Sequence, residues 1–375
     1  MSDPEPTPKT PEGEAPQGTS PADSPAPDSP AAATPPTREP SPLRRWLSRV
    51  NAVRDVPHDM ERLAWGASFI GLVFLAWWFI TRGEATSRIV GPLTLPSPGE
   101  TLASFPSLWY ERELSRSTLR SLGRVLGGFL ASAAVSIPLG IMAGTWLRLD
   151  SFLKPLSVFG RSVPIVALVP LSLMWFGFYE GGKVMFIFIA TAAFILFDSA
   201  SAARNVPDRF LDSAYTLGAK RTPKKGAILS LWFALAYGIV LGFGWHLLHG
   251  GEAVLLKDMA SSSFWWYTLS GTVLGFILWF PIMSRQILRK VILPLALPDV
   301  VNSLRLLFGL AFGYIVMAEV LGANGGLGNI ISVSQRRGPS EHIYLCLIII
   351  SLMAYTIDRL ILAAQRALFP YLKHD

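Results

Sequence analysis

Long apolar runs constrain this chain more than any other feature. A helix needs about 20 mainly apolar residues to cross the hydrocarbon core of a bilayer. The weak alternation of barrel strands is absent, so helices are the expected spanning elements. Past residue 42 we count eight candidate runs, at 63–80, 122–146, 155–178, 184–201, 228–248, 263–283, 301–321 and 343–364. The chain is therefore predicted to be an all-α integral membrane protein.

The composition agrees with this class. Hydrophobic residues make up 51% of the chain and charged residues 16%, against about 25% charged in an ordinary soluble domain. The single cysteine, Cys346, excludes an intrachain disulfide framework and a cysteine-cluster metal site. No GxxxxGK[ST] phosphate loop, HExxH or GxSxG motif occurs. We expect no catalytic residue, no metal site and no cofactor in this chain.

Residues 1–42 have a different character. They contain 13 prolines, seven acidic and two basic residues, and no Leu, Ile, Val, Phe, Trp or Tyr. A segment without large apolar side chains cannot offset its ordering entropy by burial. We expect a disordered Pro-rich tail, with a net charge of 2 − 7 = −5 that leaves +12 on the rest of the +7 chain. The basic excess then reports membrane orientation and not nucleic-acid binding.

The basic residues between the runs predict the orientation. With residues 43–62 in the cytoplasm, 20 Lys and Arg residues lie on the cytoplasmic side and eight on the other side. Loops rich in Lys and Arg stay in the cytoplasm. We therefore expect both termini there.

Five ionisable residues lie inside or near the runs, and such residues are costly in a bilayer. They are Arg124, Asp198, Arg305, Glu319 and Asp358. Asp358 precedes Arg359, and Asp198 lies close to Arg204 in the sequence. We expect structural pairing or interfacial placement for the five as a set.

The segment 203–225 is the most informative polar region. Pro207 and Gly218 frame a short amphipathic helix at 208–218, between two runs. Asp208 suits its N-terminus, and Lys220 and Arg221 suit its C-terminus. Such a helix can lie on the membrane, pack on its own bundle or insert in a groove of a soluble partner. Physical reasoning alone leaves these three alternatives open.

Sequence blocks in this chain resemble one family of transporters. Asp212-Ser213-Ala214, Gly218 and then Val291-Ile292-Leu293-Pro294 are similar to the EAA signature of permease subunits of binding-protein-dependent ABC importers. Further blocks resemble the nitrate/sulfonate/taurine branch: Leu95-Pro96-Ser97-Pro98, Arg124–Phe129, Ile137–Gly140, Val163–Pro170 with Trp175-Phe176-Gly177, and Ala318–Leu321 with Gly326-Leu327-Gly328. The resemblance covers about 63–221 and 285–370.

The resemblance implies a transport function. It implies a six-helix importer permease core in a bacterial plasma (inner) membrane. The partners would be a cytoplasmic ABC ATPase, an extracytoplasmic solute-binding protein and a second permease copy. The solute would be nitrate, a sulfonate, taurine or a similar small molecule. The rival function is a channel or secondary carrier without an ATPase.

The resemblance also assigns residues. The helix at 208–218 would be the coupling helix that docks on the ATPase, through Asp212, Ser213, Ala214, Leu217 and Gly218. This chain has Asp for the usual Glu and Ser for the first Ala. Asp has one methylene group fewer than Glu, so its carboxylate extends less far from the helix. Candidates for the translocation path are Trp175, Arg305, Glu319 and Asn324.

The spacing within the EAA signature of this chain differs from that of the family. The family's Leu-Pro follows about 13 residues after the motif glycine, which would be position 231, but Pro294 stands 63 residues further on. The extra segment holds two uncharged stretches of 26 residues each, at 226–251 and 259–284. We predict an inserted transmembrane hairpin at 222–284, between core segments 43–221 and 285–375, giving about eight spans. Two added spans keep both halves of the signature on one side, so the arm from Arg285 to Pro298 can lie beside the 208–218 helix.

A capping box is expected before the second run. Ser97 and Glu100 have the S-x-x-E spacing, and Pro98 suits the first helical position. We predict the start of a short helix there.

Overall fold

The computed structural model describes residues 58–84, 88–177, 179–249, 262–322 and 325–371. The side chains of 59, 241–249 and 262–264 are not described. The expected tail at 1–42 lies outside the described residues. The chain divides into two compact units, Met1–Ala67 and Ser68–Asp375.

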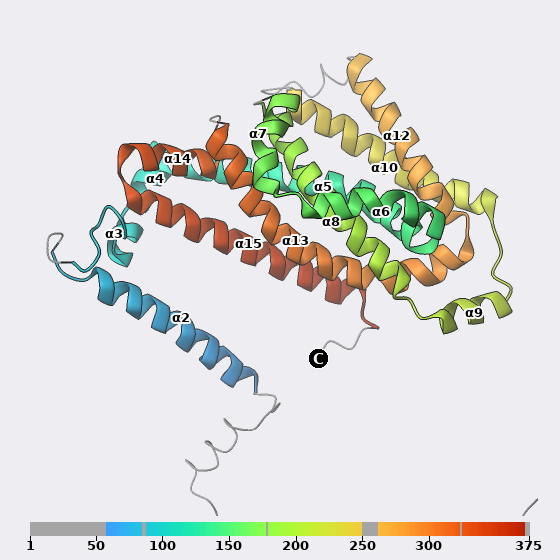
Figure 1. Ribbon diagram of the computed structural model, residues 1–375, viewed down its shortest axis with the longest axis horizontal. Helices are drawn as coiled ribbons and strands as arrows, with labels where there is room; N and C mark the ends of the chain where they lie inside the picture. Colours follow the sequence, from blue (N-terminus) through green and yellow to red (C-terminus); the bar gives the residue numbers. More distant parts are fainter. Residues whose placement is uncertain (1–57, 85–87, 178, 250–261, 323–324, 372–375) are drawn as a thin grey trace, which may run out of the picture. The chain divides into compact units, whose positions relative to one another are not determined.

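Helices are the main regular elements of the described residues, which also contain a single antiparallel bridge between Arg221 and Arg285. Figure 1 labels the helices: α2 (Asp59–Thr81), α3 (Pro98–Ala103), α4 (Phe105–Glu111), α5 (Leu114–Thr145), α6 (Leu147–Ser162), α7 (Ile165–Phe176), α8 (Glu180–Arg204), α9 (Asp208–Thr216), α10 (Pro223–His249), α12 (Ser262–Met283), the π-helical turn η1 (Leu288–Ile292), α13 (Leu293–Leu321), α14 (Leu327–Arg337) and α15 (Ser340–Leu368).

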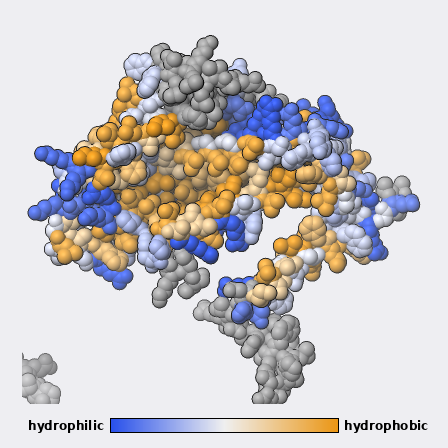
Figure 2. All heavy atoms as spheres, turned by 180° about the vertical axis from the view of Figure 1, so that it is seen from behind, coloured by the Kyte–Doolittle hydropathy of each residue, from blue (hydrophilic) through white to orange (hydrophobic). Residues whose placement is uncertain are grey.

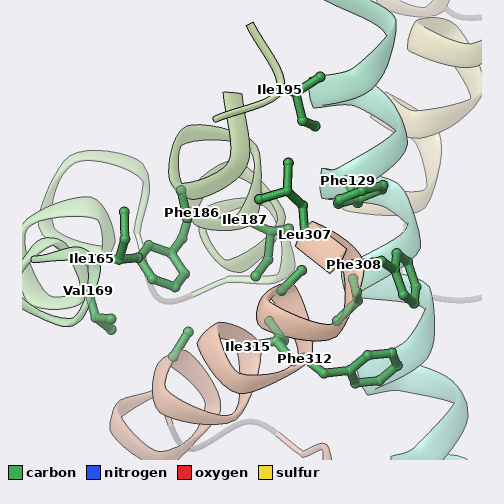
Figure 3. Packing of buried hydrophobic residues seen from close by; sticks show 14 of the residues in the cluster. Phe129, Ile165, Val169, Phe186, Ile187, Ile195, Leu307, Phe308, Phe312 and Ile315 are labelled. Carbon is green, nitrogen blue, oxygen red and sulfur yellow. The ribbon is translucent and has the colours of Figure 1, made fainter. Parts of the chain in front are cut away.

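The main core lies where α5, α7, α8 and α13 meet. Figure 3 shows Phe129, Phe186, Ile187 and Phe312 converging from three of these helices. Glycines let α5 approach α8 closely, because a Cβ added to Gly140 would stand 2.6 Å from the Leu196 carbonyl oxygen. Exposed apolar side chains cover the outside of the bundle, and the face in Figure 2 shows an apolar band between hydrophilic groups. This distribution suits a bundle that contacts lipid on its outer surface.

Six helical segments of the described residues are long and apolar enough to cross a membrane. They are Met60–Thr81, Leu114–Thr145, Glu180–Arg204, Trp265–Met283, Leu288–Leu321 and Ser340–Leu368. The pair α6 and α7 would be a seventh if it counts as one span. The predicted total of eight spans, with a transmembrane hairpin, stays a prediction.

The run predicted at 155–178 is not one continuous helix. It divides into α6 and α7, which bend by 106°. Val163 is extended (φ −74°, ψ 130°), and Pro164 follows it. A residue before proline avoids the helical region, and proline has no N–H for the helical hydrogen bond. Hydropathy alone does not locate such a break, because the two helices taken together are apolar enough to pass as one span.

Helices α10 and α12 pack closely against each other. A Cβ on Gly275 would stand 2.9 Å from the Ala234 Cα atom, and one on Gly238 would lie 2.7 Å from the Thr268 carbonyl oxygen. Phe233 and Trp279 stack with ring centroids 4.3 Å apart. Small residues thus let the two backbones approach closely.

The capping box is confirmed. Ser97 Oγ accepts from the Glu100 N–H at 3.2 Å, and the Glu100 carboxylate accepts from the Ser97 N–H at 2.8 Å. Pro98 is the first residue of α3. Arg88 adds a two-pronged ion pair to Glu100, at 2.8 and 3.0 Å. The pairing and the cap together lower the pKa of Glu100 to about 2.

Candidate functional site

Helix α9 lies beyond the end of α8 (Figure 1) and carries three of the predicted coupling residues, Asp212, Ser213 and Ala214. It ends at Thr216, two residues before the predicted end, so Leu217 and Gly218 follow it. Pro207 is its N-cap, with an extended backbone that suits a helix start. Every residue of the helix is at least partly exposed. Asp212 and Ser213 are exposed, and Ala214 is half-buried.

Gly218 ends this helix in the way the sequence predicts. Its φ is +76°, the left-handed region in which a glycine carries no penalty. The Gly218 N–H donates to the Tyr215 carbonyl and the Ala219 N–H to the Ala214 carbonyl, both at 2.9 Å. These two bonds form a Schellman motif, which fixes the exit direction of the chain.

The apolar side chains of α9 point in two directions. Leu211 packs inward against a buried cluster that includes Val206, Leu288 and Ile292. Leu217, just after the helix, is 88% exposed, and Tyr215 is 64% exposed. One face thus fixes α9 to the end of α8 and to η1, while the other is open to a partner. The prediction that the return arm lies beside this helix is confirmed at η1.

The chain returns to this place after α12. The Thr222 N–H donates to the Ser284 carbonyl at 2.8 Å, and the Gln286 N–H to the Lys220 carbonyl at 3.3 Å. A Cβ on Gly226 would stand 2.4 Å from the Ser284 Cα atom. The segment that contains α10 and α12 therefore leaves and rejoins the rest of the fold at one point.

A second site is a buried network of charged groups centred on Arg124. Its Nη1 atom lies 2.5 Å from Glu319 Oε1, and its Nε and Nη2 atoms each lie 2.5 Å from an oxygen of Glu180. Arg124 also donates to the Gly325 carbonyl at 3.0 Å. The network joins α5, α8, α13 and the turn before α14.

Glu319 is fully buried, and its carboxylate accepts several hydrogen bonds. Ser121 Oγ lies 2.8 and 2.9 Å from its two oxygens, and the Gly328 N–H donates to it at 2.9 Å. Gly326 has a φ of +103°, and a Cβ there would stand 2.4 Å from a Glu319 oxygen. The Gly326-Leu327-Gly328 block thus lets the start of α14 close over this carboxylate.

Two of the other predicted path residues, Trp175 and Arg305, form no hydrogen bond or ion pair with this network among the described residues. Trp175 is 66% exposed near the end of α7. Arg305 is half-buried and pairs with Asp358 at 2.9 and 3.1 Å. Asn324 lies outside the described residues. Whether these four residues line a path stays a prediction.

The pairing expected for the ionisable residues occurs with different partners. Asp358 pairs with Arg305 on α13 and not with its neighbour Arg359. Arg204 pairs with Asp150 at 2.8 Å, where Asp198 was expected. Adjacent residues on a helix point in different directions, whereas these observed pairs bridge separate helices.

Sequence reasoning missed Glu180 and Lys183 as members of the charged network. Glu180 begins α8, and the Lys183 side chain on the same helix is fully buried. Their spacing of three residues places them on one helix face, which is a signal of a shared environment. Their proximity to Arg124 depends on tertiary packing across 56 and more residues, which spacing does not reveal.

These features define a multi-pass helical membrane protein with an exposed helix anchored between two bundle segments. The chain belongs to the family of binding-protein-dependent transport system inner membrane components, whose profile matches residues 136–224 and 282–374. The two matched segments leave 225–281 between them, which covers nearly all of α10 and α12.

Three curated relatives agree with this family. A putative ABC transporter permease protein of Methanocaldococcus jannaschii is 29% identical over 65% of this chain and 68% of its own length. The putative aliphatic sulfonates transport permease protein SsuC of Bacillus subtilis is 24% identical over 86% and 94% of the two chains. The taurine transport system permease protein TauC of Escherichia coli is 23% identical, over 80% and 87%.

This chain also matches a solved structure over part of its length. The MetNI methionine ABC transporter in an inward-facing conformation matches with a TM-score of 0.48 and 17% identity, over 70% of this chain and 98% of that chain.

Proposed function

We propose that this chain is the permease subunit of an ATP-driven importer and that α9 couples it to a cytoplasmic ATPase. The observation that carries the proposal is the two-sided character of α9. Leu211 fixes the helix to the bundle, while Leu217 and Tyr215 are exposed. An exposed apolar group on a short anchored helix is typical of helix-in-groove recognition.

The anchoring supports a mechanism of force transmission. Val206 and Ile292 belong to one buried cluster, and Leu211 packs on it. A displacement of α9 would therefore shift the ends of α8 and α13 together. ATP-driven closure of the ATPases would use this connection to switch the bundle between inward-open and outward-open states. ATP hydrolysis itself would take place in the separate subunit.

A second copy of this chain would complete the translocation path. Gly309 and Gly313 lie on an exposed face of α13, where a Cβ at either position would meet nothing within 4 Å. Leu306 and Leu310 are exposed beside them. Small residues on an open face of a spanning helix favour close packing with another helix. We propose that this face and Trp175 lie at the permease dimer and its path.

The charged network would hold the outer end of the bundle. With both termini in the cytoplasm, the start of α14 and the Arg124–Glu319 pair would lie toward the extracytoplasmic side, where a solute-binding protein delivers its cargo. Relatives are named for aliphatic sulfonates and taurine. We propose a small solute of this kind. Uptake by the whole complex with labelled sulfonate, taurine and nitrate would identify it.

A charge introduced at Leu217 tests the coupling proposal. A Leu217→Asp variant should lose co-purification with the ATPase and solute-stimulated ATP hydrolysis, because a carboxylate cannot occupy an apolar groove without cost. The control is Leu93→Asp, since Leu93 is similarly exposed, at 79%, outside any helix near α3. It should leave both readouts unchanged.

Two results would contradict the coupling proposal. An unchanged ATPase association in Leu217→Asp would contradict docking through α9. Solute flux driven by an ion gradient, from the purified chain without any ATPase, would favour the secondary carrier instead.

A further inference from the structure

A pocket beside α9 is lined by cationic side chains. It is formed by Thr145, Tyr215, Ala219, Lys220, Arg221, Arg285, Gln286, Ile287 and Leu288. Three of these residues are basic and none is acidic. Among the described residues, no carboxylate forms an ion pair with Lys220, Arg221 or Arg285. The pocket therefore carries positive charge without a protein counter-charge.

The backbone holds two of these charges together. Arg221 and Arg285 face each other in the antiparallel bridge, which is flanked by the Thr222–Ser284 and Gln286–Lys220 hydrogen bonds. Like charges directly opposite each other destabilise such a pair. Arg285 is also held in place, because its guanidinium lies 5.0 Å from the Trp146 ring centroid. An anion in the pocket would relieve the repulsion.

The helix that follows the pocket residue Arg221 along the chain has an apolar exposed face. Helix α10 starts at Pro223, and its side chains Ile228, Leu231 and Trp232 are exposed, on the face opposite to the buried Gly226, Ser230 and Ala234. Ile228 lies six residues beyond Thr222, or roughly 9 Å along a helix axis. This distance is comparable to the polar interfacial layer of one leaflet, about 5–8 Å. A ligand with an anionic head and apolar chains would match both parts.

We propose that this pocket binds the phosphate headgroup of an anionic phospholipid, whose acyl chains lie along the exposed face of α10. The occupant is a lipid and not a free phosphate, because α10 starts at Pro223, two residues after the pocket residue Arg221, and exposes apolar side chains. The bound lipid would join the exit of α9 to the base of the α10–α12 segment. This proposal goes beyond the coupling function and does not depend on the identity of the solute.

Lipid retention by the purified full chain tests the proposal. Delipidated protein in detergent is titrated with phosphatidylglycerol or phosphatidylcholine, and native mass spectrometry counts bound lipids. We expect phosphatidylglycerol to bind more tightly than phosphatidylcholine. An Arg221→Gln/Arg285→Gln variant should bind it about 25-fold more weakly, since each cation near a headgroup contributes roughly a factor of five. The matched control, Arg336→Gln/Arg337→Gln, removes two exposed arginines at the end of α14 and should bind as the wild type does.

Three results would overturn the proposal. The first is equal phosphatidylglycerol affinity in the Arg221/Arg285 variant and the wild type. The second is displacement of the lipid by inorganic phosphate at equal concentration, which would indicate a simple anion site. The third is loss of ATPase association in this variant with unchanged lipid binding, which would assign the cations to an acidic protein surface. Failure of lipid binding alone would leave the Leu217 experiment, and the coupling function, unaffected.

Discussion

Arg124 and Glu319 form an ion pair between α5 and α13 in which both side chains are almost completely buried. Their Nη1 and Oε1 atoms are 2.5 Å apart, and the exposed fractions of the two side chains are 3% and 0%. Removing one partner of a buried pair costs far more than the pair itself contributes, because the other charge stays buried. The pair also closes the turn before α14 through the Gly325 carbonyl.

A neutral amide at position 319 should therefore destabilise the protein. We expect Glu319→Gln to lose about 1–3 kcal/mol of stability, because Arg124 keeps its pair with Glu180 while the hydrogen bonds to the buried carboxylate are weakened. The loss is measured as a lower midpoint of thermal unfolding in detergent. The control is Glu113→Gln, since the Glu113–Arg116 pair is exposed on both sides and such pairs contribute about 0–1 kcal/mol. A Glu319→Gln variant with wild-type stability but a changed KM for uptake would contradict this structural role and favour the predicted place in the path.

A bulky residue at Gly218 should block coupling without disturbing the bundle. A Cβ at Gly218 would meet nothing within 4 Å, so the first atom of a larger side chain has room in the free chain. The positive φ adds a local cost of about 1–2 kcal/mol. We expect Gly218→Trp to abolish ATP-dependent uptake and ATPase co-purification while the chain still inserts in the membrane.

The matched control for this variant is Gly338→Trp. Gly338 ends α14 with a φ of +100° and equally open surroundings. A substitution there is also strained by a positive φ, at a helix that the proposal does not place at the ATPase. Normal uptake by Gly218→Trp, or equal loss in both variants, would exclude a specific contact at Gly218.

The elements that sequence predicts well here are those set by local chemistry. Apolar length gave the long helices, the Ser97–Glu100 spacing gave the cap, and Gly218 gave the exit turn. Each depends on residues within a few turns of one another. The helix break at Pro164 could have been predicted, because the residue before a proline avoids the helical region. Hydropathy instead indicated one continuous span at 155–178.

The pairing within the charged network could not be predicted from the sequence, because it depends on contacts between distant segments. Arg124 and Glu319 were recognised from the sequence as residues that are costly in apolar runs. They pair with each other, however, and are 195 residues apart along the chain. Only packing of α5 against α13 and α14 makes them neighbours. The same holds for the Arg305–Asp358 pair, which joins two helices where the sequence suggested an adjacent partner.

Acid should weaken the start of α3. The pKa of Glu100 is lowered to about 2 by the Arg88 pair and the Ser97 cap, so its contribution to stability is complete above the ordinary pKa of about 4.5 and is lost as the pH falls toward 2. Because Glu100 is partly exposed, we expect no more than about 1 kcal/mol. Hydrogen exchange of residues 97–104, corrected for the intrinsic rate, should accelerate over this range.

Glu100→Gln provides the comparison for this titration. Its amide cannot ionise, so the corrected exchange rate should be the same at pH 5 and pH 2.5 and close to that of the acidified wild type. A wild-type rate that does not change with pH would contradict the ion-paired cap.

Removal of the α10–α12 segment should leave coupling possible. Thr222 and Ser284 are joined by a backbone hydrogen bond of 2.8 Å, so a deletion of 223–283 can be closed with a Gly-Gly link. The deletion also removes Ile282 and Met283 from the buried cluster against which Leu211 packs, so we expect the shortened chain to be less stable. The family profile matches the chain on both sides of this segment. We expect the shortened chain to insert, to retain ATPase association, and to lose its preference for phosphatidylglycerol, because the apolar face of α10 is gone.

The control for this deletion is the full chain with Gly-Gly inserted between Thr222 and Pro223, which tests the link itself. That insertion should disturb the Arg221–Arg285 bridge while keeping both helices. If the deletion inserts normally but loses the ATPase, whereas the insertion retains it, then the segment takes part in docking. In that case α10 and α12 are part of the coupling machinery and not an accessory to a six-helix core.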